Sequence, residues 1–144
     1  MNLNISLADW VNHRKPAYKS LVGVTVVTMG DDDTLSPPFL AFYETSSEQF
    51  VQGDVPMYGV STIEITAELQ TVPVSPDQDG TSPDQERQMR RDIYDIVGDR
   101  LAIEWMEFRN NWRVFDIRMA SPTTEPTEER RISRWVITAV ACPI

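Results

Sequence analysis

Histidine and cysteine are nearly missing from this 144-residue chain, which contains one of each, His13 and Cys142. Nucleophilic catalysis by serine or cysteine needs a neighbouring base, and zinc needs three or four Cys, His or carboxylate ligands. A Cys142–His13 dyad is the one pair of this kind that the sequence permits, and no local motif supports it. The apolar residues around Cys142 predict a buried thiol. We therefore expect no catalytic residues and no structural metal.

Glycine is also scarce, and its six residues are scattered. None of them forms a G-x-G-x-x-G or Walker pattern, so no phosphate-binding loop and no cofactor are expected. Long apolar runs are missing as well, because no stretch approaches the roughly 20 residues that span a bilayer. Residues 1–14 lack the continuous apolar core of a signal peptide. The sequence therefore predicts neither a membrane segment nor export.

Positive charge is nearly missing from the first half of the chain. Residues 1–80 hold 11 acidic and three basic residues, whereas residues 81–144 hold 11 acidic residues and ten basic ones, all arginine. Arginine forms planar bidentate pairs with carboxylates, so these charges could pair within the chain or between neighbouring copies of it. The net charge of −9 argues against sequence-specific binding of nucleic acid, because it provides no attraction for phosphates.

Clustered carboxylates provide the main alternative to a non-enzymatic protein. The run Asp31-Asp32-Asp33 could hold Mg²⁺ or Ca²⁺ in a small metal- or ligand-binding enzyme, but EF-hand spacing is missing. A solvated acidic turn is the favoured interpretation. Glu64 and Glu68 lie on one face of a predicted strand, about 13 Å apart, which is too far for a paired glycosidase site. We expect these two glutamates to face water or a partner subunit.

A capping box predicts the clearest helix. Ser82 precedes Gln85 at the spacing at which each side chain caps the backbone N–H of the other residue. Apolar residues then follow on one face of this helix: Met89, Ile93, Ile96 and Val97. A shorter helix is predicted over residues 6–14 with Ser6 as its cap, and helical spacing recurs over residues 101–109 after a break at Gly98.

Strict alternation over residues 62–70 predicts a half-buried strand with one solvated face, which is typical of an antiparallel sheet. A β-branched run predicts a strand buried on both faces at residues 21–28. Further strands are predicted at residues 39–45, 112–119 and 131–142, and loops near residues 30–38, 46–56, 73–83 and 120–130. The sequence thus predicts one α+β domain over residues 1–144, a mostly antiparallel sheet of about five strands with two or three helices packed on one face.

The order of these motifs resembles the tail terminator and neck (head–tail joining) proteins of tailed bacteriophages. The matching segments cover most of the chain from Val22 onward: Pro-Phe-Leu-Ala-Phe-Tyr-Glu-Thr (38–45), the tyrosine-led strand that starts Pro-Met-Tyr (56–69), the helix at 84–97, Trp-Arg-Val-Phe-Asp (112–116), Ser-Pro-Thr-Thr-Glu (121–125) and the closing strand at 135–143. Each is a common kind of strand, helix or turn, so the resemblance rests on their order.

The resemblance implies a structural virion protein and not an enzyme. Members of that family are small α/β proteins that assemble as rings, often hexamers, which cap the tail tube and join it to the head. The implied partners are other copies of the chain, the tail tube protein and head-completion proteins, and the implied location is the virion, with assembly in the host cytoplasm. A head-completion or connector protein and a tail-tube subunit remain alternatives. A tube subunit would expose a long stacking hairpin, for which residues 73–83 or 120–130 are the candidates.

The sequence also offers candidate subunit contacts. These are the polar loops and a set of charged residues that lie in or beside the strands: Arg113, Arg118, Arg130, Arg131, Arg134, Glu64 and Glu68. Each of them could instead be an ordinary surface charge that pairs within its own chain and adds little stability.

Overall fold

A computed structural model describes residues 3–28, 36–77, 79–99, 112–126 and 129–143. The elements follow in the order α1 (Leu3–Arg14), two short 3₁₀ turns (Lys15–Ala17 and Lys19–Leu21), β1 (Thr25–Val27), β2 (Phe39–Gln52), β3 (Val55–Thr71), α2 (Pro83–Val97), β4 (Trp112–Met119), β5 (Thr123–Pro126) and β6 (Arg131–Pro143).

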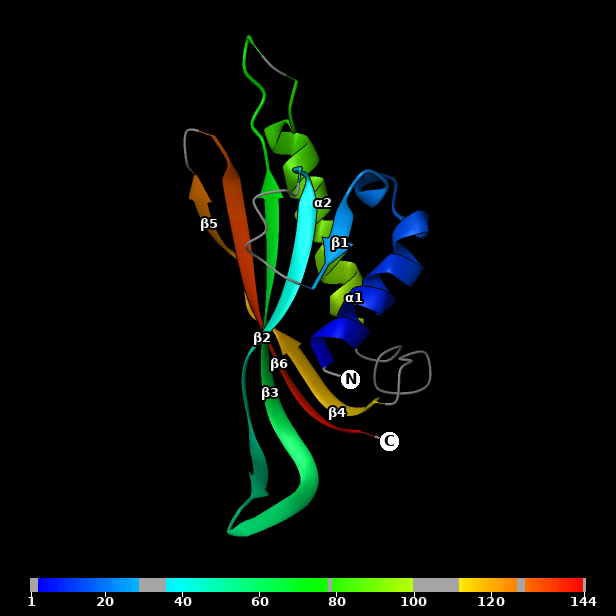
Figure 1. Ribbon diagram of the computed structural model, residues 1–144, viewed down its shortest axis with the longest axis vertical. Coiled ribbons are helices and arrows are strands. Elements are labelled where there is room, and N and C mark those ends of the chain that lie inside the picture. Colours follow the sequence, from blue (N-terminus) through cyan, green and yellow to red (C-terminus); the bar gives the residue numbers. More distant parts are fainter. Residues whose placement is uncertain (1–2, 29–35, 78, 100–111, 127–128, 144) are drawn as a thin grey trace.

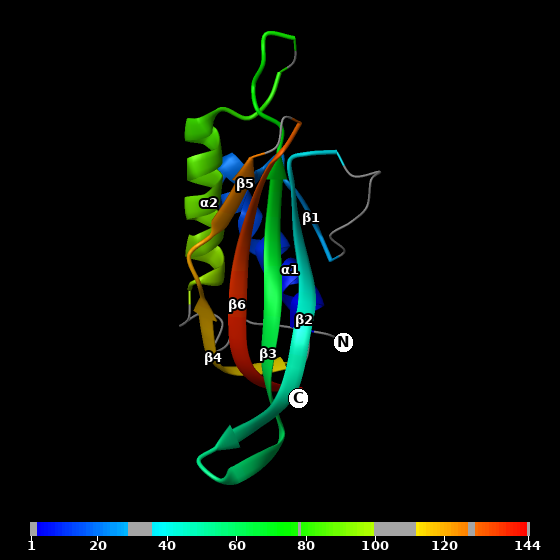
Figure 2. The ribbon, with the colours of Figure 1, turned by 90° about the vertical axis from the view of Figure 1, so that its left-hand side faces the viewer.

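The six strands form one sheet in the order β1-β2-β3-β6-β4, with β5 also paired to β6. All neighbouring pairs are antiparallel except β1 and β2, which run parallel. Both helices lie on the same face of the sheet, and the other face carries no helix among the described residues (Figures 1 and 2). The α+β class is as predicted, with a mixed sheet of six strands. The predicted helix at residues 101–109 lies outside the described residues.

The core fills the space between this sheet and the two helices. It joins apolar side chains from every layer, all at most 9% exposed, among them Leu7, Val11, Ile65, Ile93, Ile96 and Trp135. Two hydrogen bonds tie α1 to its neighbours: Trp10 Nε1 donates to the Ile96 carbonyl of α2 at 3.3 Å, and Asn4 Nδ2 donates to the Phe42 carbonyl of β2 at 3.2 Å. These bonds fix both helices against the same part of the sheet.

The helix α2 begins as its capping box predicts. The Gln85 backbone N–H donates to Ser82 Oγ at 3.2 Å, and the Ser82 N–H donates to Gln85 Oε1 at 2.9 Å. The predicted apolar stripe of this helix is buried, which confirms the prediction. Two acidic residues, Glu86 and Asp92, are buried beside the stripe, at 2% and 7% exposure. The sequence pattern did not indicate their burial.

The first helix begins earlier than predicted, because α1 starts at Leu3 and Ser6 is a buried residue inside it. Ser6 is therefore not the cap. Leu3, Leu7 and Val11 are spaced four residues apart, and all three are fully buried. Residues four apart lie on one face of a helix, so burying Leu3 with the other two requires an additional turn at the start.

The β-branched run at residues 21–28 does not form one long buried strand. It divides into a 3₁₀ turn that ends at Leu21, an exposed Val22, and the three residues of β1. Among the described strands β1 lies at the sheet edge and pairs with β2 alone, and its three residues are exposed or half-buried. The prediction of burial on both faces was wrong because a strand at an edge has one neighbour.

Two predicted loops contain strands. Residues 46–52 continue β2, and residues 123–126 form β5. Both segments are polar, and a polar composition excludes burial but not backbone pairing with a neighbouring strand. Polar composition was therefore not sufficient to predict a loop at residues 46–52 and 123–126.

Candidate interaction surfaces

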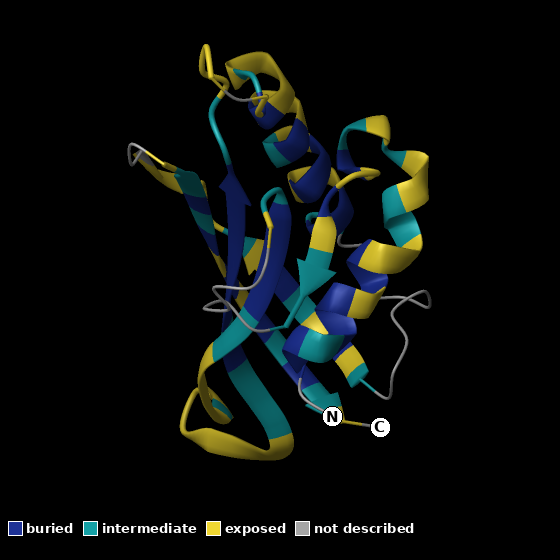
Figure 3. Ribbon diagram, turned by 45° about the horizontal axis from the view of Figure 1, so that its top comes forward, coloured by how far each residue is buried: buried dark blue, intermediate teal, exposed yellow. Residues whose placement is uncertain are grey.

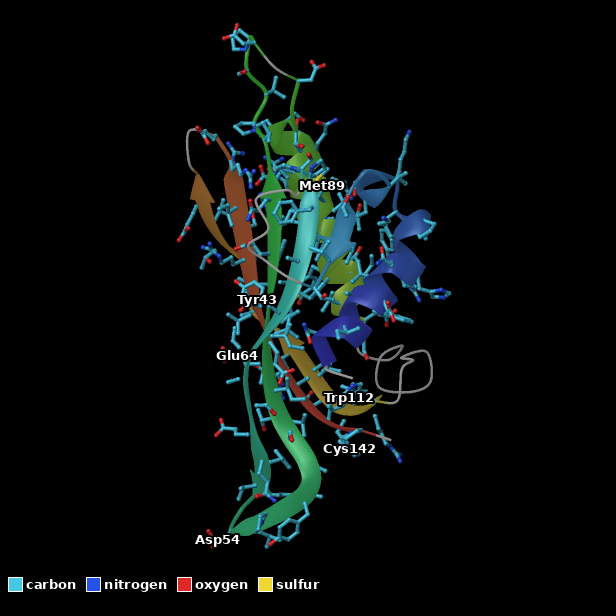
Figure 4. The ribbon with its side chains drawn as sticks, in the orientation of Figure 1. Tyr43, Asp54, Glu64, Met89, Trp112 and Cys142 are labelled. Carbon is cyan, nitrogen blue, oxygen red and sulfur yellow. The ribbon has the colours of Figure 1, made fainter. Side chains whose placement is uncertain are left out.

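The most distinctive surface is the far end of the β2–β3 hairpin, which extends beyond the rest of the sheet (Figures 1 and 2). We call residues 45–60 the arm. None of its residues is buried, and only Phe50 and Val60 are even half-buried. Its turn contains Gly53, whose φ of 62° lies in the region that glycine adopts without steric cost. Asp54 lies at the tip of the arm (Figure 4).

The arm exposes apolar side chains to solvent on both of its faces. The exposed fractions are 86% for Tyr58, 65% for Val55, 52% for Val51 and 39% for Met57. Val51 pairs with Pro56, and side chains two residues apart in a strand point the same way, so Val51 and Tyr58 share one face. Val55 and Met57 share the other face. Figure 3 shows most of the arm as exposed.

The arm carries only negative charge. It contains Glu48 and Asp54, and the sequence has no lysine or arginine between Lys19 and Arg87. Glu64 lies where the arm meets the sheet (Figure 4), and its carboxylate accepts a hydrogen bond from Thr45 Oγ1 at 3.0 Å. The arm thus combines exposed apolar residues with an acidic field.

At the other end of the sheet, the face without helices carries a network of charged and amide side chains. Arg134 Nε donates to Glu68 Oε1 at 2.8 Å, and its Nη1 donates to Glu125 at 2.9 Å. Gln70 donates to the second oxygen of Glu68 at 2.8 Å and accepts a hydrogen bond from Arg130 at 2.8 Å. The hydrogen bonds from Arg134 to Glu125 and to Glu68 raise the pKa of Arg134.

This network corrects the predicted solvated face of residues 62–70. Glu68 and Gln70 are 4% and 7% exposed, so the second half of that strand is buried on both faces. The alternation correctly predicted a strand at these residues. The polar side chains at its second half are nevertheless buried, because they contact one another and Arg134. Buried polar groups require hydrogen-bond partners, and Glu68 has them here.

A second buried carboxylate, Glu86 of α2, joins the helix to the sheet. It forms ion pairs with Arg90 on the same helix and with Arg131 of β6, the latter at 3.1 Å. Thr71 Oγ1 of β3 lies 3.5 Å from the same carboxylate. The two arginines are about one quarter to one third exposed, so water still reaches them while Glu86 is shielded.

The predicted contact residues therefore fall into two groups. Arg130, Arg131, Arg134 and Glu68 belong to the two networks within the chain. Arg113, Arg118 and Glu64 lie at the opposite end of the sheet, nearer the arm. Whether any of these residues contacts another subunit remains a prediction.

The strand β4 displays the second surface of interest. Among the described strands it pairs only with β6, so its other edge has no described strand beside it. A bulge between Val114 and Asp116 carries Phe115, which is 49% exposed, and the Arg113 guanidinium lies 5.7 Å from the centre of the Phe115 ring. Arg118 pairs with Asp116 at 3.1 Å, and its side chain is 76% exposed. This edge is apolar and rich in arginine.

Clustered metal-ligating side chains would indicate an enzyme or a metal site. The described part of the chain contains no group of three or more His, Cys, Asp or Glu side chains that could hold a metal ion. Asp31-Asp32-Asp33 lies outside the described residues. His13 lies beside the Trp10 ring near the end of α1, with ring centres 6.2 Å apart. Cys142 of β6 is half-buried, not fully buried as predicted, and lies at the same end of the sheet as Trp112 (Figure 4).

The arm is the feature that sequence reasoning missed. Its apolar residues stand among serines and glutamines, and this polar surrounding predicts a loop over residues 46–56. The signal that could have found it is the Gly53-Asp54 pair, which separates two runs that contain valine and an aromatic residue, as in a hairpin turn.

Comparison of the sequence with protein-family models and with curated proteins gave no match to either. No helix within the described ranges is long and apolar enough to cross a membrane.

Proposed function

We propose that this chain is a structural subunit of a tailed bacteriophage: a tail terminator that forms a ring, caps the tail tube and joins it to the head. The observation that carries the proposal is the arm. A two-stranded hairpin is marginally stable in water by itself, and exposed apolar side chains gain stability when a partner covers them. The sequence resemblance to the tail terminator and neck family supplies the identity of the assembly.

The mechanism in this proposal is surface complementarity. One ring face would match the last ring of the tail tube, and the other would present a surface to head-completion proteins while accepting no further tube subunits. Contact between protein surfaces does not need a nucleophile, a base or a metal. The buried Glu68 and Glu86 networks support such a role by holding the sheet and α2 in a fixed arrangement from which the arm projects.

A tail-tube subunit or a head-completion protein is the second candidate, and the arm favours the tube subunit in particular. Tube subunits use a long hairpin for stacking, and the β2–β3 hairpin is such an element. It lies outside both of the segments in which the sequence suggested one. Residues 123–126 of the second of those segments instead form β5, which pairs with β6.

Electron microscopy of the purified protein distinguishes these candidates. Closed rings are expected for a terminator. Open-ended tubes of variable length would contradict the terminator and identify a tube subunit. Particles that remain single chains would indicate a head-completion protein that assembles only on its partner.

A thermal-shift screen with Mg²⁺, Ca²⁺ and nucleotides tests the enzyme alternative. Ligands that bind only the folded state raise the melting temperature, by about 2.7 kcal/mol of stabilisation at a ligand concentration one hundred times Kd. We expect no shift. A clear shift that is lost when Asp31, Asp32 and Asp33 are replaced by asparagine would contradict the structural role and place a site in that acidic run.

A further inference from the structure

We infer that the arm of one copy docks along β4 of a second copy, in a head-to-tail contact. This inference rests on the part of the proposed function in which the chain assembles with itself. In this contact the arm of the first copy covers Phe115 and Arg113 of the second, and in the part of the chain that the structure describes no strand pairs with the outer edge of β4.

Charge complementarity is the first argument. The arm contains Glu48 and Asp54 and no basic residue. The edge strand β4 presents Arg113 and Arg118, both exposed, and its one acidic residue, Asp116, is already paired with Arg118. Opposite charges on two surfaces accelerate their encounter and fix their orientation. Two arms placed against each other would instead bring like charges together.

Exposed apolar side chains and open strand edges on the arm and on β4 also favour this contact. Tyr58 and Val51 lie on one face of the arm, and Phe115 is exposed on the bulge of β4. Aromatic residues and arginine are the side chains that most often anchor protein interfaces. The arm also has open strand edges, because β1 pairs only with residues 39–41 of β2 and β6 pairs with β3 only from Ser61 onward. An extended segment can add to a sheet edge that has no neighbouring strand, and no described strand lies at the outer edge of β4.

The arm and β4 are different surfaces of the chain, so a contact between them leaves one arm and one β4 unoccupied at the two ends of a dimer. Contacts of this heterologous kind continue until the rotation closes a ring, or they produce an open filament. A ring therefore needs no additional interface. An arm that paired with another arm would stop at a dimer.

Two assembly-deficient variants test the inference. One carries the substitutions Val51→Ser and Tyr58→Ser in the arm, and the other carries Arg113→Glu and Phe115→Ser in β4. Analytical ultracentrifugation should show that each variant by itself is a monomer, whereas the wild type forms the complete assembly. Mixed in equal amounts, they should form a dimer and nothing larger, because each supplies the surface that the other lacks. Exposed apolar residues that belong to neither the arm nor β4 provide the matched control: Val22→Ser and Tyr94→Ser together should assemble like the wild type.

The outcomes separate the inference from the proposed function. If both variants form wild-type assemblies, or if the mixture stays monomeric while circular dichroism shows both variants folded, the inference is wrong. Rings that persist in the arm variant contradict the inference and leave the terminator proposal standing. Open filaments of the wild type, with a 1:1 dimer from the mixed variants, support the inference and contradict the terminator. A wild type that remains monomeric at its solubility limit overturns the inference.

Discussion

The strands β2 and β3 contain two regions that differ sharply although they share the same backbone pairing. Residues 39–42 and 65–71 are buried throughout, whereas nothing in the arm is buried. The two strands pair in both regions, with register shifts between Glu44 and Ser46 and between Gln49 and Val51, and the second shift leaves residues 57–60 outside the ladder. The two regions differ in their neighbouring elements. The strand β6 pairs with β3 only from Ser61 onward, and α1 and α2 lie beside the part of the sheet away from the arm. Burial in this sheet therefore depends on the neighbouring strands, the helices on one face and the side-chain network on the other, and not on the hairpin itself.

The largest effect should come from the core side of this comparison. Trp135 of β6 is 1% exposed, and Trp135→Ala should lower the free energy of unfolding by about 3–5 kcal/mol because it leaves a cavity. The adjacent Val136 points to the opposite face and is 42% exposed, so Val136→Ala should cost less than about 1 kcal/mol. Urea denaturation measures both. Equal losses would contradict the assignment of one packed face.

The buried carboxylate of α2 gives the next effect. Glu86→Ala should cost about 2–4 kcal/mol, because it leaves Arg90 and Arg131 without their shielded partner. Asp84→Ala on the same helix removes an exposed pair with Arg87 and should cost at most about 1 kcal/mol. The two variants are compared by urea denaturation at one pH. A larger loss for Asp84→Ala would show that Glu86 is not what joins the helix to the sheet.

The cap of α2 should have a smaller effect. Ser82→Ala removes the acceptor of the Gln85 N–H and should lower the free energy of unfolding by about 1 kcal/mol. Ser82→Asp retains an acceptor at the same place and should be close to the wild type. Thermal unfolding of the three proteins measures the difference. Equal losses in both variants would show that the serine side chain itself, and not its role as a hydrogen-bond acceptor, stabilises this end of α2.

The smallest effect on folding should come from the arm. Tyr58 is 86% exposed, so Tyr58→Ser should change the free energy of unfolding of the monomer by no more than about 0.5 kcal/mol. Stability is measured under dilute conditions that keep the protein monomeric, and assembly is measured separately by light scattering. Loss of assembly with unchanged monomer stability would show that the arm serves contact and not folding. A destabilised monomer would contradict this separation, because the arm would then contribute to the core.

The elements that were predicted well are those whose signal is local. The capping box located the start of α2, and the alternation at residues 62–70 located a strand that the structure extends in both directions. The segments predicted from polarity were located less well: the second half of β2 and all of β5 are strands made mostly of polar residues. Backbone pairing needs a neighbour and not a hydrophobic side chain, so composition underestimates strands of this kind.

The candidate contacts show the same division. The sequence predicted Arg134 and Glu68 as candidate subunit contacts, and the structure pairs them with each other across 66 positions of the chain. Their distance along the sequence left open whether they pair within a chain or between chains. The arm was not anticipated, because exposure depends on where the neighbouring strand ends.

The sequence alone was enough to establish the α+β class, the apolar face of α2 and the scarcity of histidine and cysteine. These follow from periodicity, capping and composition, which act over a few residues. The tertiary structure decided that Glu68 and Glu86 are buried with arginine partners, that β1 is a short edge strand, and that residues 45–60 project as an exposed hairpin. The physical reason is that burial and pairing are properties of the neighbours that a residue meets, and these neighbours come from distant parts of the chain.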